Sequence, residues 1–581
     1  MPVNPTYPGV YIDEVKSAVR TITGVPTAVA AFVGYAPRGP VDRPVHITSW
    51  ADYETVFGGL HQDSPLSYAV YQFYLNGGSE AEIVRLVGEA VHVALPIGRT
   101  PRAVGGSPAV PADESAPESP AEPGDRAHET TRPTRSRRRP GLLAASPGSW
   151  ALKLRARVDY ETGDDTETRG GERKLFNLTV RDTGTGIEEK YLNVSIESDS
   201  PRSLTHVLAM SRLVKVDPDN PIVELPEQND EPERAGVDPF ADGSQGAGGP
   251  LECFTVPLHD GTHLDTMPEL RNYKGEESDK TGLYQLLKTD IFNVLCLPGC
   301  HDHLDNPQDV RALHDMAVGL CAARRAILLV DPPGEWTRSS VGSPFSIDVV
   351  AKGPEGTPSL PSGASTKNAA LYFPRIVAPD PLRQGTARAF PPCGVMAGVL
   401  ARTDAQRGVW KAAAGTDASL NGVSDLEVPL TDLENGRLNP LGINCLRRLP
   451  AVGPVAWGAR TMRGADRLAD EWKYLPVRRL ALFVEESIFR GTQWVVFEPN
   501  DEPLWASIRL NVGAFMNSLF RAGAFQGRTP QQAYLVKCDR ENNPQNDIDR
   551  GIVNVQVGFA PLKPAEFVII HIQQLAGQIE V

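Results

Sequence analysis

RRLALFVEESIFRGTQWVVFEPNDEPLWASIRLNVGAFMNSLFRAGAF, residues 478–525, is the stretch that decides the fold of the C-terminal part of the chain. Apolar residues recur at helical spacing from Val477 to Ile488, which predicts a first helix buried on more than one side. Gly491 is placed to cap this helix in a left-handed conformation, and the aromatic and β-branched run Trp494–Phe497 then predicts a short strand. We therefore expect Val496 to lie in a desolvated core between two helices.

A second helix is predicted to follow directly. Pro499, Asn500 and Asp501 form a turn whose polar side chains can cap a helix, and Glu502 suits the first helical turn. The helix then presents one apolar stripe, formed by Leu504, Ile508, Val512, Phe515 and Leu519. The two helices are expected to frame the buried strand.

The segments on both sides of a long central block alternate between strand and helix patterns. Near the N-terminus, strands are predicted at 27–34, near His46 and at 82–87, with helices at 51–57 and after Pro65. Later in the chain, strands are predicted at 291–297, 326–330 and 370–376, with helices at 309–324 and 395–405. The strand, helix, strand order over 291–330 predicts a parallel pair joined by a right-handed crossover. Three late strands are expected at 532–538, 551–557 and 565–573.

The central block has a different pattern and different flanks. Residues 142–216 alternate apolar and polar positions at period two, which predicts a β-rich module with a short helix near 203–213. Stretches rich in Pro, Gly, Ser and charge bound this module, and they predict flexible linkers. The basic run RPTRSRRRP, residues 132–140, lacks the aromatic residues of a nucleic-acid site and is better explained as a solvated loop.

The predicted fold is therefore a multidomain protein of the α/β and α+β classes, with a mixed α/β core, extended arms at both ends and an inserted β-rich domain. Its expected parts are the N-terminal arm 1–26, the first core segment 27–98, a linker 99–141, the β-rich domain 142–216, an acidic linker 217–275, the second core segment 276–450, the C-terminal domain 451–550, and C-terminal strands with an arm 551–581.

The composition and charge of the chain argue against several classes of binding partner. The chain has 581 residues, with 72 acidic and 58 basic side chains and a formal charge of −14, which argues against nucleic acid or an anionic membrane as the main partner. Met1 is not followed by a signal-peptide pattern and no apolar run is long enough to span a bilayer, so we expect a cytosolic protein without membrane insertion. Seven scattered cysteines predict reduced thiols.

One compact group of residues has the chemistry of a metal site. Cys296, Cys300, His301 and His303 form a CxxxCHxH group that offers soft ligands. Structural zinc sites usually join two separated ligand pairs, so the favoured interpretation is two inert thiols and two solvated imidazoles, with no metal and no cofactor.

Signs of catalysis are weak. Asp331, after a predicted strand, precedes two prolines and is expected to be a turn residue. Gly184 and Gly186 lie in the β-rich block without a following helix pattern, so they do not make a nucleotide-binding loop. No catalytic or cofactor-binding residue is therefore predicted. The alternative hypothesis is an α/β enzyme with a β-rich accessory domain, which would need a convergent polar cluster in a pocket.

Several segments together resemble a known family. FVEESIFRGTQWVVFEPND (483–501) is similar to the C-terminal domain of contractile tail sheath proteins of phage tails, contractile bacteriocins and related injection systems. YPGVYIDEV (7–15), PTAVAAFVGYAPRGP (26–40), ITSWADYETVFGG (47–59) and PAEFVIIHIQQ (564–574) resemble that family in the same order. The resemblance covers roughly residues 7–97 and 280–581.

The resemblance implies a structural role and not an enzyme. A sheath subunit polymerises helically around an inner tube and contracts to drive that tube through a target cell envelope. The implied partners are further copies of the chain, the inner tube protein, and baseplate and terminator or cap proteins. The implied location is the bacterial cytoplasm during assembly, and then a phage tail or tail-like particle.

The resemblance also implies where subunits touch. Arms exchanged between neighbouring subunits would pair as strands, and unpaired strands at both chain ends suit that role. The inner wall of the C-terminal domain would face the tube, near Glu485 and Arg509. The residues expected in strand exchange are Val10, Tyr11, Ile12, Val553, Val555, Val557, Phe567 and Ile569.

Overall fold

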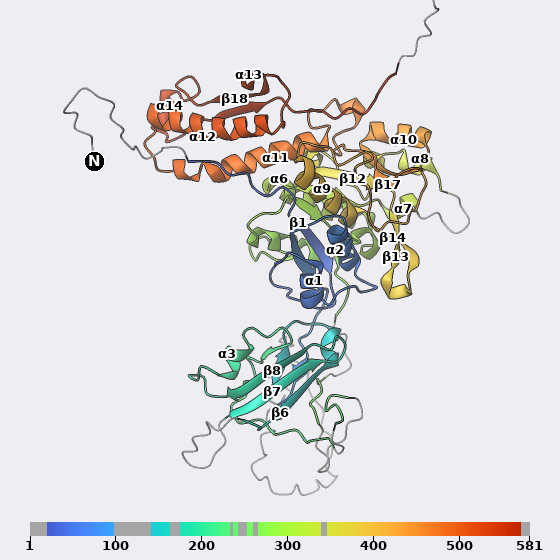
Figure 1. The fold of residues 1–581 in the computed structure, drawn as a ribbon, viewed down its shortest axis with the longest axis vertical. Coiled ribbons are helices and arrows are strands. Elements are labelled where there is room, and N and C mark those ends of the chain that lie inside the picture. Colours follow the sequence, from blue (N-terminus) through green and yellow to red (C-terminus); the bar gives the residue numbers. More distant parts are fainter. Residues whose placement is uncertain are drawn as a thin grey trace, which may run out of the picture.

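The computed structural model describes residues 20–97, 141–162, 175–232, 236–241, 253–258, 265–337 and 345–570. These residues form a central α/β core, a β-rich domain at one end and a C-terminal domain at the other (Figure 1). The mixed α/β multidomain fold predicted from the sequence is confirmed. No helix within the described ranges is long and apolar enough to cross a membrane.

A mixed sheet forms the centre of the core. Within the described residues it has eight strands, in the spatial order β17 (Gly453–Ala456), β16 (Ile443–Leu449), β12 (Ala369–Phe373), β11 (Ile327–Val330), β10 (Val294–Cys296), β1 (Ala30–Tyr35), β3 (Ala81–Leu86) and β2 (Val45–Ile47). All strands from β16 to β3 run parallel, and β17 and β2 pair antiparallel at the edges. Strands buried on both faces must be apolar throughout, which explains runs such as AAFVGY in β1.

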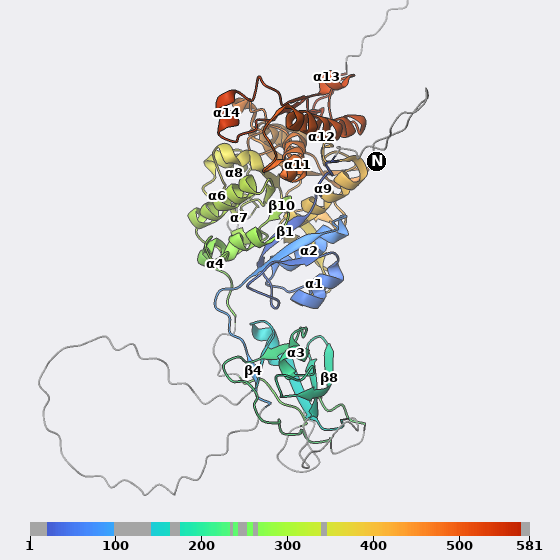
Figure 2. The ribbon, with the colours of Figure 1, turned by 90° about the vertical axis from the view of Figure 1, so that its left-hand side faces the viewer.

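Helices cover both faces of this sheet (Figure 2). One face packs against α1 (Trp50–Phe57), α2 (Pro65–Leu75) and α9 (Cys393–Arg407), and the other against α4 (Leu270–Lys274) and α6 (Pro307–Ala323). Local capping explains where these helices begin: the Ser49 hydroxyl accepts from the Asp52 amide, and the Asn306 side chain accepts from the Gln308 amide. Helix α6 joins the parallel strands β10 and β11, so the predicted strand, helix, strand unit is confirmed.

Shorter elements complete the core. They are α5 (Cys300–His303), α7 (Gly334–Thr337), α8 (Ile347–Val350), α10 (Asp432–Leu438), and a small sheet of β13 (Ile376–Asp380), β14 (Thr386–Phe390) and β15 (Asp425–Leu426).

The inserted domain has its own apolar core, as its alternating sequence predicts. One sheet contains β4 (Ala94–Leu95), β5 (Leu142–Ala144) and β9 (Val214–Val216), and the other contains β6 (Leu154–Asp159), β7 (Leu175–Asp182) and β8 (Glu188–Ser195). Helix α3 (Leu204–Leu208) packs on the same cluster of buried residues. Gly184 and Gly186 lie in the turn between β7 and β8.

The chain enters and leaves the inserted domain through one antiparallel pair. The Gly88 amide donates to the Thr266 carbonyl (2.9 Å), and the Thr266 amide donates to the Glu89 carbonyl (3.1 Å). Tyr273, only seven residues further on, is fully buried in the core of the main sheet. The structural boundary of the insertion therefore falls at Glu89 and Thr266.

A buried arginine fastens this domain to the core. Arg85 on β3 is completely buried, and its guanidinium donates to the carbonyl oxygens of Ala36 (2.7 Å), Gly39 (2.7 Å), Pro37 (3.0 Å) and Pro147 (2.9 Å). Pro147 belongs to the inserted domain, so the contact spans the junction. A buried charge is tolerated only when its donors are satisfied, and these carbonyls meet that need.

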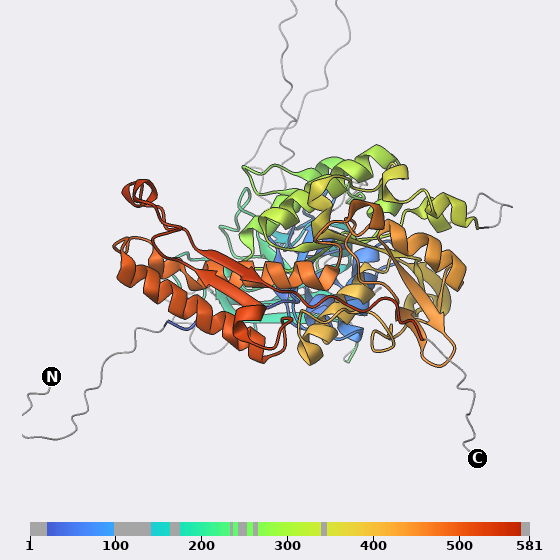
Figure 3. The ribbon, with the colours of Figure 1, turned by 90° about the horizontal axis from the view of Figure 1, so that it is seen from above.

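The C-terminal domain projects to one side of the core (Figure 3). It contains α11 (Leu475–Gly491), α12 (Glu502–Arg521), α13 (Pro530–Ala533), α14 (Gln545–Asp549) and a ribbon of β18 (Tyr534–Lys537) and β19 (Gln556–Phe559). The Asp501 side chain caps α12 by accepting from the Leu504 amide, as predicted. The predicted stripe of α12 is buried along its length, at Leu504, Ile508, Val512, Phe515 and Leu519.

The predicted strand at Trp494–Phe497 is wrong. Gln493–Val495 form a 3-10 turn between α11 and α12, Val496 is 59% exposed and Phe497 is 102% exposed with a φ of 71°. The connection turns outward instead of passing between the helices, because α11 and α12 pack directly on each other's apolar faces through Phe483 and Phe515. Val496 is therefore a surface residue.

Gly491 does not cap α11 in a left-handed conformation, contrary to the prediction. Gly491 is the last helical residue, and the C-cap is Thr492, whose φ is −110°. A Cβ at Gly491 would lie 2.7 Å from the side chain of Ile22. The glycine is needed because another segment of the chain approaches the helix closely there.

A buried ion pair joins the C-terminal domain to the core. Arg479 on α11 and Asp404 on α9 lie 2.6 Å apart, and their side chains are 4% and 5% exposed. Arg479 also donates to the carbonyl of Thr27, which precedes β1. The first turns of α11 are thereby fixed to two elements of the sheet core.

Candidate functional site

The segment that leads from the N-terminal arm lies against the C-terminal domain. Ile22 is 5% exposed and belongs to the same apolar cluster as α11 and α12. The Arg20 amide donates to the Asn511 side chain (3.0 Å), and its guanidinium lies 4.7 Å from the centroid of the Trp494 ring. Residues 20–26 are thus held by their own subunit, and Val10, Tyr11 and Ile12 fall outside the described residues.

The other end of the chain leaves the C-terminal domain and runs back across the core (Figures 1 and 3). After β19, the Ala560 amide donates to the Ala533 carbonyl (2.8 Å). From residue 562 to residue 570 the chain belongs to no strand or helix of the described structure. We call this segment, 562–570, the tail.

Glu566 anchors the tail to the core. Its carboxylate accepts from Arg460 Nε (2.7 Å) and Arg460 Nη2 (2.5 Å) in a bidentate pair. Arg460 is completely buried and also donates to Asp466 and to the carbonyls of Asn439 and Gly464. Paired charges raise the pKa of the Arg460 guanidinium despite the desolvation that opposes this. Such a pair is both strong and directional.

Beyond this anchor the tail exposes a run of large apolar side chains. Phe567, Val568, Ile569 and Ile570 are 73%, 81%, 78% and 77% exposed. Four consecutive exposed side chains of this kind differ from the scattered apolar residues of an ordinary surface. Phe567 and Ile569, both predicted to take part in strand exchange, are therefore mostly exposed on their own subunit.

The remaining residues predicted for strand exchange lie in or before the β18–β19 ribbon. Val557 is in β19, whereas Val553 and Val555 precede it, so the strand is shorter than the predicted 551–557. Val553 and Val557 pack partly against the cluster of the C-terminal domain, and Val555 is 37% exposed. The ribbon contains just these two strands among the described residues, so each has an outer edge without a strand partner.

Glu485 and Arg509, predicted to face an inner tube, lie on α11 and α12 and each has a partner within its own subunit. Glu485 lies 3.2 Å from Arg478, and Arg509 lies 2.6 Å from Glu502. The tip between these helices also exposes apolar side chains, since Phe489 is 50% exposed beside Val496 and Phe497. This exposed tip was not predicted, because the apolar run Trp494–Phe497 is typical of a buried strand.

Asp331, expected to be a turn residue, lies in the connection after β11 and is a buried acceptor. It is 4% exposed, and its carboxylate accepts from the Cys393 amide (2.9 Å) at the start of α9. Desolvation raises the pKa of Asp331 to about 7. Asp331 directly follows β11, in the connection to α7, and the sequence pattern did not predict its burial.

The predicted CxxxCHxH group is split by the fold. Cys296 is in β10 and its thiol faces the Cys393 carbonyl at 3.7 Å, whereas Cys300 lies 3.6 Å from a different residue, His314 on α6. His301 and His303 are half-buried, and each has a buried ring nitrogen without a hydrogen-bond partner, so the expected solvated imidazoles are wrong.

The comparisons with known proteins agree with the resemblance read from the residues. Residues 469–574 match the family model described as the phage tail sheath C-terminal domain. The tail sheath protein of Vibrio phage KVP40 is 28% identical over 182 residues, which are 31% of this chain and 26% of that protein. The tail sheath protein of Burkholderia phage BcepMu is 24% identical over 247 residues, or 42% and 48% of the two chains. Less than half of each relative is therefore matched.

A solved structure matches nearly the whole chain. The helical sheath of the anti-feeding prophage in its contracted state is 20% identical, with 98% of this chain and 100% of that chain covered at a TM-score of 0.51. At this identity the likeness concerns the fold. Residues 469–574 thus match the phage tail sheath C-terminal domain, and the chain as a whole has the fold of the contracted helical sheath of the anti-feeding prophage.

Proposed function

We propose that this chain is the structural subunit of a contractile sheath, which polymerises helically around an inner tube and contracts to drive the tube through a target cell envelope. The observation that carries the proposal is the tail: Phe567–Ile570 are exposed and apolar, while Glu566 fixes their starting point. An apolar segment outside any strand of its own subunit suits pairing with another chain.

The proposed contact is strand exchange between neighbouring subunits. Phe567 and Ile569 from one subunit would pair beside the ribbon that contains Val557 in the next, with Val553 and Val555 leading into that ribbon. Val10, Tyr11 and Ile12 of the N-terminal arm are proposed to contribute a further strand. A contact that joins two different surfaces head to tail, without closing into a ring, gives a helical filament.

The inner tube protein is proposed to contact the outer faces of α11 and α12, where Glu485 and Arg509 lie. Both side chains are partly exposed. Glu485 pairs with Arg478, and Arg509 donates to Glu502 and to the Cys538 carbonyl, so each is placed to make a further ion pair across an interface. Baseplate and terminator or cap proteins are proposed as partners at the two ends of the filament. Nucleic acid and insertion into a membrane are not part of the proposal, nor is a cofactor. Assembly would take place in the bacterial cytoplasm, and the product would be a phage tail or a tail-like particle.

The alternative, an α/β enzyme, is not supported by the pocket beneath the tail. A cavity of about 770 Å³ lies beneath the tail, but its described lining contains no cysteine, histidine, serine or aspartate. Glu566 in that lining is already paired with Arg460. The comparisons name sheath proteins, so we infer a non-enzymatic role.

Electron microscopy tests the proposal. The purified full-length protein is expected to form hollow helical tubes, and deletion of residues 565–581 is expected to abolish them. The truncated protein should keep the cooperative melt of the full chain, because the tail contributes no residue to an apolar core of the described structure. Tubes of normal length from the truncated protein would contradict strand exchange by the tail. A variant that alters the exposed Met210 in the inserted domain, Met210→Ser, serves as an assembly-competent control.

A further inference from the structure

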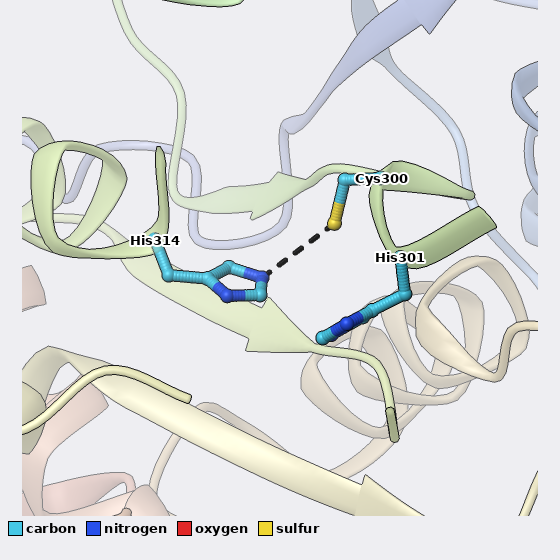
Figure 4. Close-up of side chains that lie close together, drawn as sticks. All are labelled: Cys300, His301 and His314. Atoms are coloured by element: carbon cyan, nitrogen blue, oxygen red, sulfur yellow. Dashed lines mark hydrogen bonds between the residues drawn. The ribbon is translucent and has the colours of Figure 1, made fainter. Parts of the chain in front are cut away.

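A cluster of soft-metal donors lies at the carboxyl end of β10, away from the surfaces proposed for assembly. Cys300 and His301 begin α5, and His314 projects toward them from α6 (Figure 4). One candidate ligand atom from each of the three side chains lies within 4.8 Å of the other two. We propose that Cys300, His301 and His314 form a binding site for a single Zn²⁺ ion.

The distance between the donor atoms of Cys300 and His314 fits a single bound ion. The distance from Cys300 Sγ to His314 Nε2 is 3.6 Å. With a Zn–S bond of about 2.3 Å and a Zn–N bond of about 2.05 Å, two ligands at the tetrahedral angle lie about 3.5 Å apart. The two atoms are thus already at the separation that a shared zinc ion imposes.

The orientation of His314 fits as well. Its Nδ1 lies 3.1 Å from the carbonyl oxygen of Ser359. A carbonyl oxygen can only accept, so Nδ1 carries the proton and the lone pair of Nε2 points toward Cys300. Metal-binding histidines are held in this way, with the second ring N–H donated to a backbone carbonyl or carboxylate.

His301 supplies an independent observation. Its Nε2 atom is buried and has no hydrogen-bond partner among the described residues. Its ring centroid lies 5.1 Å from that of His314, with 49° between the ring planes, so the rings are not stacked. Buried polar atoms are nearly always satisfied, and a metal bond to one ring nitrogen would account for this ring's position.

The electrostatics of the cluster are compatible with a divalent cation. Desolvation lowers the pKa of His301 well below its ordinary value and that of His314 to about 4, so both imidazoles are neutral, as ligands must be. Burial raises the pKa of the Cys300 thiol, and the carboxylates of Asp331 and Asp302 raise it further. The thiol would therefore lose its proton when the ion binds.

The proposed site would tie together three segments that are separate in sequence. It would join the start of α5, the second turn of α6, and through His314 the loop that contains Ser359. Three protein ligands leave the fourth tetrahedral position for a water molecule. The inference does not depend on the sheath function, since it concerns the interior of the core.

Cobalt titration of the full-length protein tests the proposal. After removal of metal by a chelator, Co²⁺ is expected to bind at one ion per chain and to give the near-ultraviolet charge-transfer band of a cobalt thiolate, and Zn²⁺ should displace it. Cys300→Ala is expected to abolish the band, and His314→Gln to weaken binding by at least about tenfold. Added Zn²⁺ should raise the Tm of the wild-type protein but not that of Cys300→Ala.

The matched controls are Cys321→Ala and His303→Gln. Cys321 is a buried cysteine on α6, and His303 is a half-buried histidine of α5, but neither belongs to the cluster. Both variants should keep the band and the zinc-dependent rise in Tm. The wild-type titration tests the metal site even if a variant fails to fold. If Co²⁺ gives no thiolate band with the wild-type protein, Cys300 and His314 share only a hydrogen bond. An unchanged band in Cys300→Ala would equally overturn the site.

Discussion

Replacing Glu566 with alanine is expected to release the tail while leaving the rest of the subunit folded. The carboxylate of Glu566 makes two charge-assisted hydrogen bonds to Arg460 and links residues 106 positions apart. Arg460 is completely buried but retains Asp466 and two backbone carbonyls when Glu566 is lost. The variant should therefore undock the tail without leaving an unpaired charge in the core.

The size of the effect follows from these bonds. Hydrogen bonds to charged groups contribute about 1.5–3 kcal/mol each, and the partial compensation by Asp466 suggests a net loss of about 2–3 kcal/mol for the docked tail. Since about 1.4 kcal/mol corresponds to a factor of ten, the undocked population should rise roughly 30- to 150-fold. The thermal unfolding of the core should hardly change.

Chymotrypsin can measure this equilibrium. Cleavage after Phe567 requires the neighbouring residues to leave the surface, and its rate follows the undocked population when docking is fast. The cut should accelerate in Glu566→Ala by about the same factor as the population. Asp466→Ala is the matched control, because it removes the other carboxylate of Arg460 and leaves the tail anchor in place. Equal cleavage rates in Glu566→Ala and wild type would refute the anchoring role.

Three further changes test the C-terminal domain and the insertion. Val496→Asp should cost less than about 0.5 kcal/mol and leave a soluble protein, whereas Val512→Asp, at a fully buried position, should prevent folding as judged by circular dichroism. Ile22→Ala should lower the free energy of unfolding by about 2–4 kcal/mol in denaturant titrations, because the side chain fills the space against Gly491. Deletion of residues 90–265, with a two-glycine link between Glu89 and Thr266, should leave one cooperative melting transition, since those residues already lie side by side.

Each of these three predictions has an outcome that would contradict it. An unfolded Val496→Asp protein would mean that the tip between α11 and α12 is core after all. An Ile22→Ala protein as stable as wild type would remove the leading segment from the domain core. Loss of the melting transition on deletion would show that the core depends on the inserted domain, for example because the Arg85 guanidinium loses the Pro147 carbonyl.

The sequence predicted elements whose signals are local. Asp501 and the stripe that begins at Leu504 define α12 within a few residues, and the order of β10, α6 and β11 follows from apolar runs of different period. The run Trp494–Phe497 was wrongly predicted to be a buried strand, because apolar composition does not say whether the surface that covers such residues belongs to the same chain. Gly491 was wrongly predicted to be a left-handed helix cap. A glycine can either cap a helix or allow another segment to approach closely, and the sequence pattern does not distinguish these uses.

The site residues that were missed depend on contacts between distant parts of the chain. Glu566 directly precedes an apolar run, but nothing near it in the sequence points to Arg460. Likewise His314 is 14 residues from Cys300, and only the packing of α5 on α6 brings them together. The CxxxCHxH motif contained Cys296 and His303 but not His314, because a motif read from sequence spacing joins only residues that are close in the chain.

The buried pair between Arg479 and Asp404 has a mechanical consequence. Removing one partner of such a pair typically costs about 3–5 kcal/mol, because the other charge is left in a medium of low polarity. Pulling α11 away from α9 would separate these charges before water could reach them. A force that pulls α11 away from α9 would thus be opposed first at this pair, and through it would reach the central sheet.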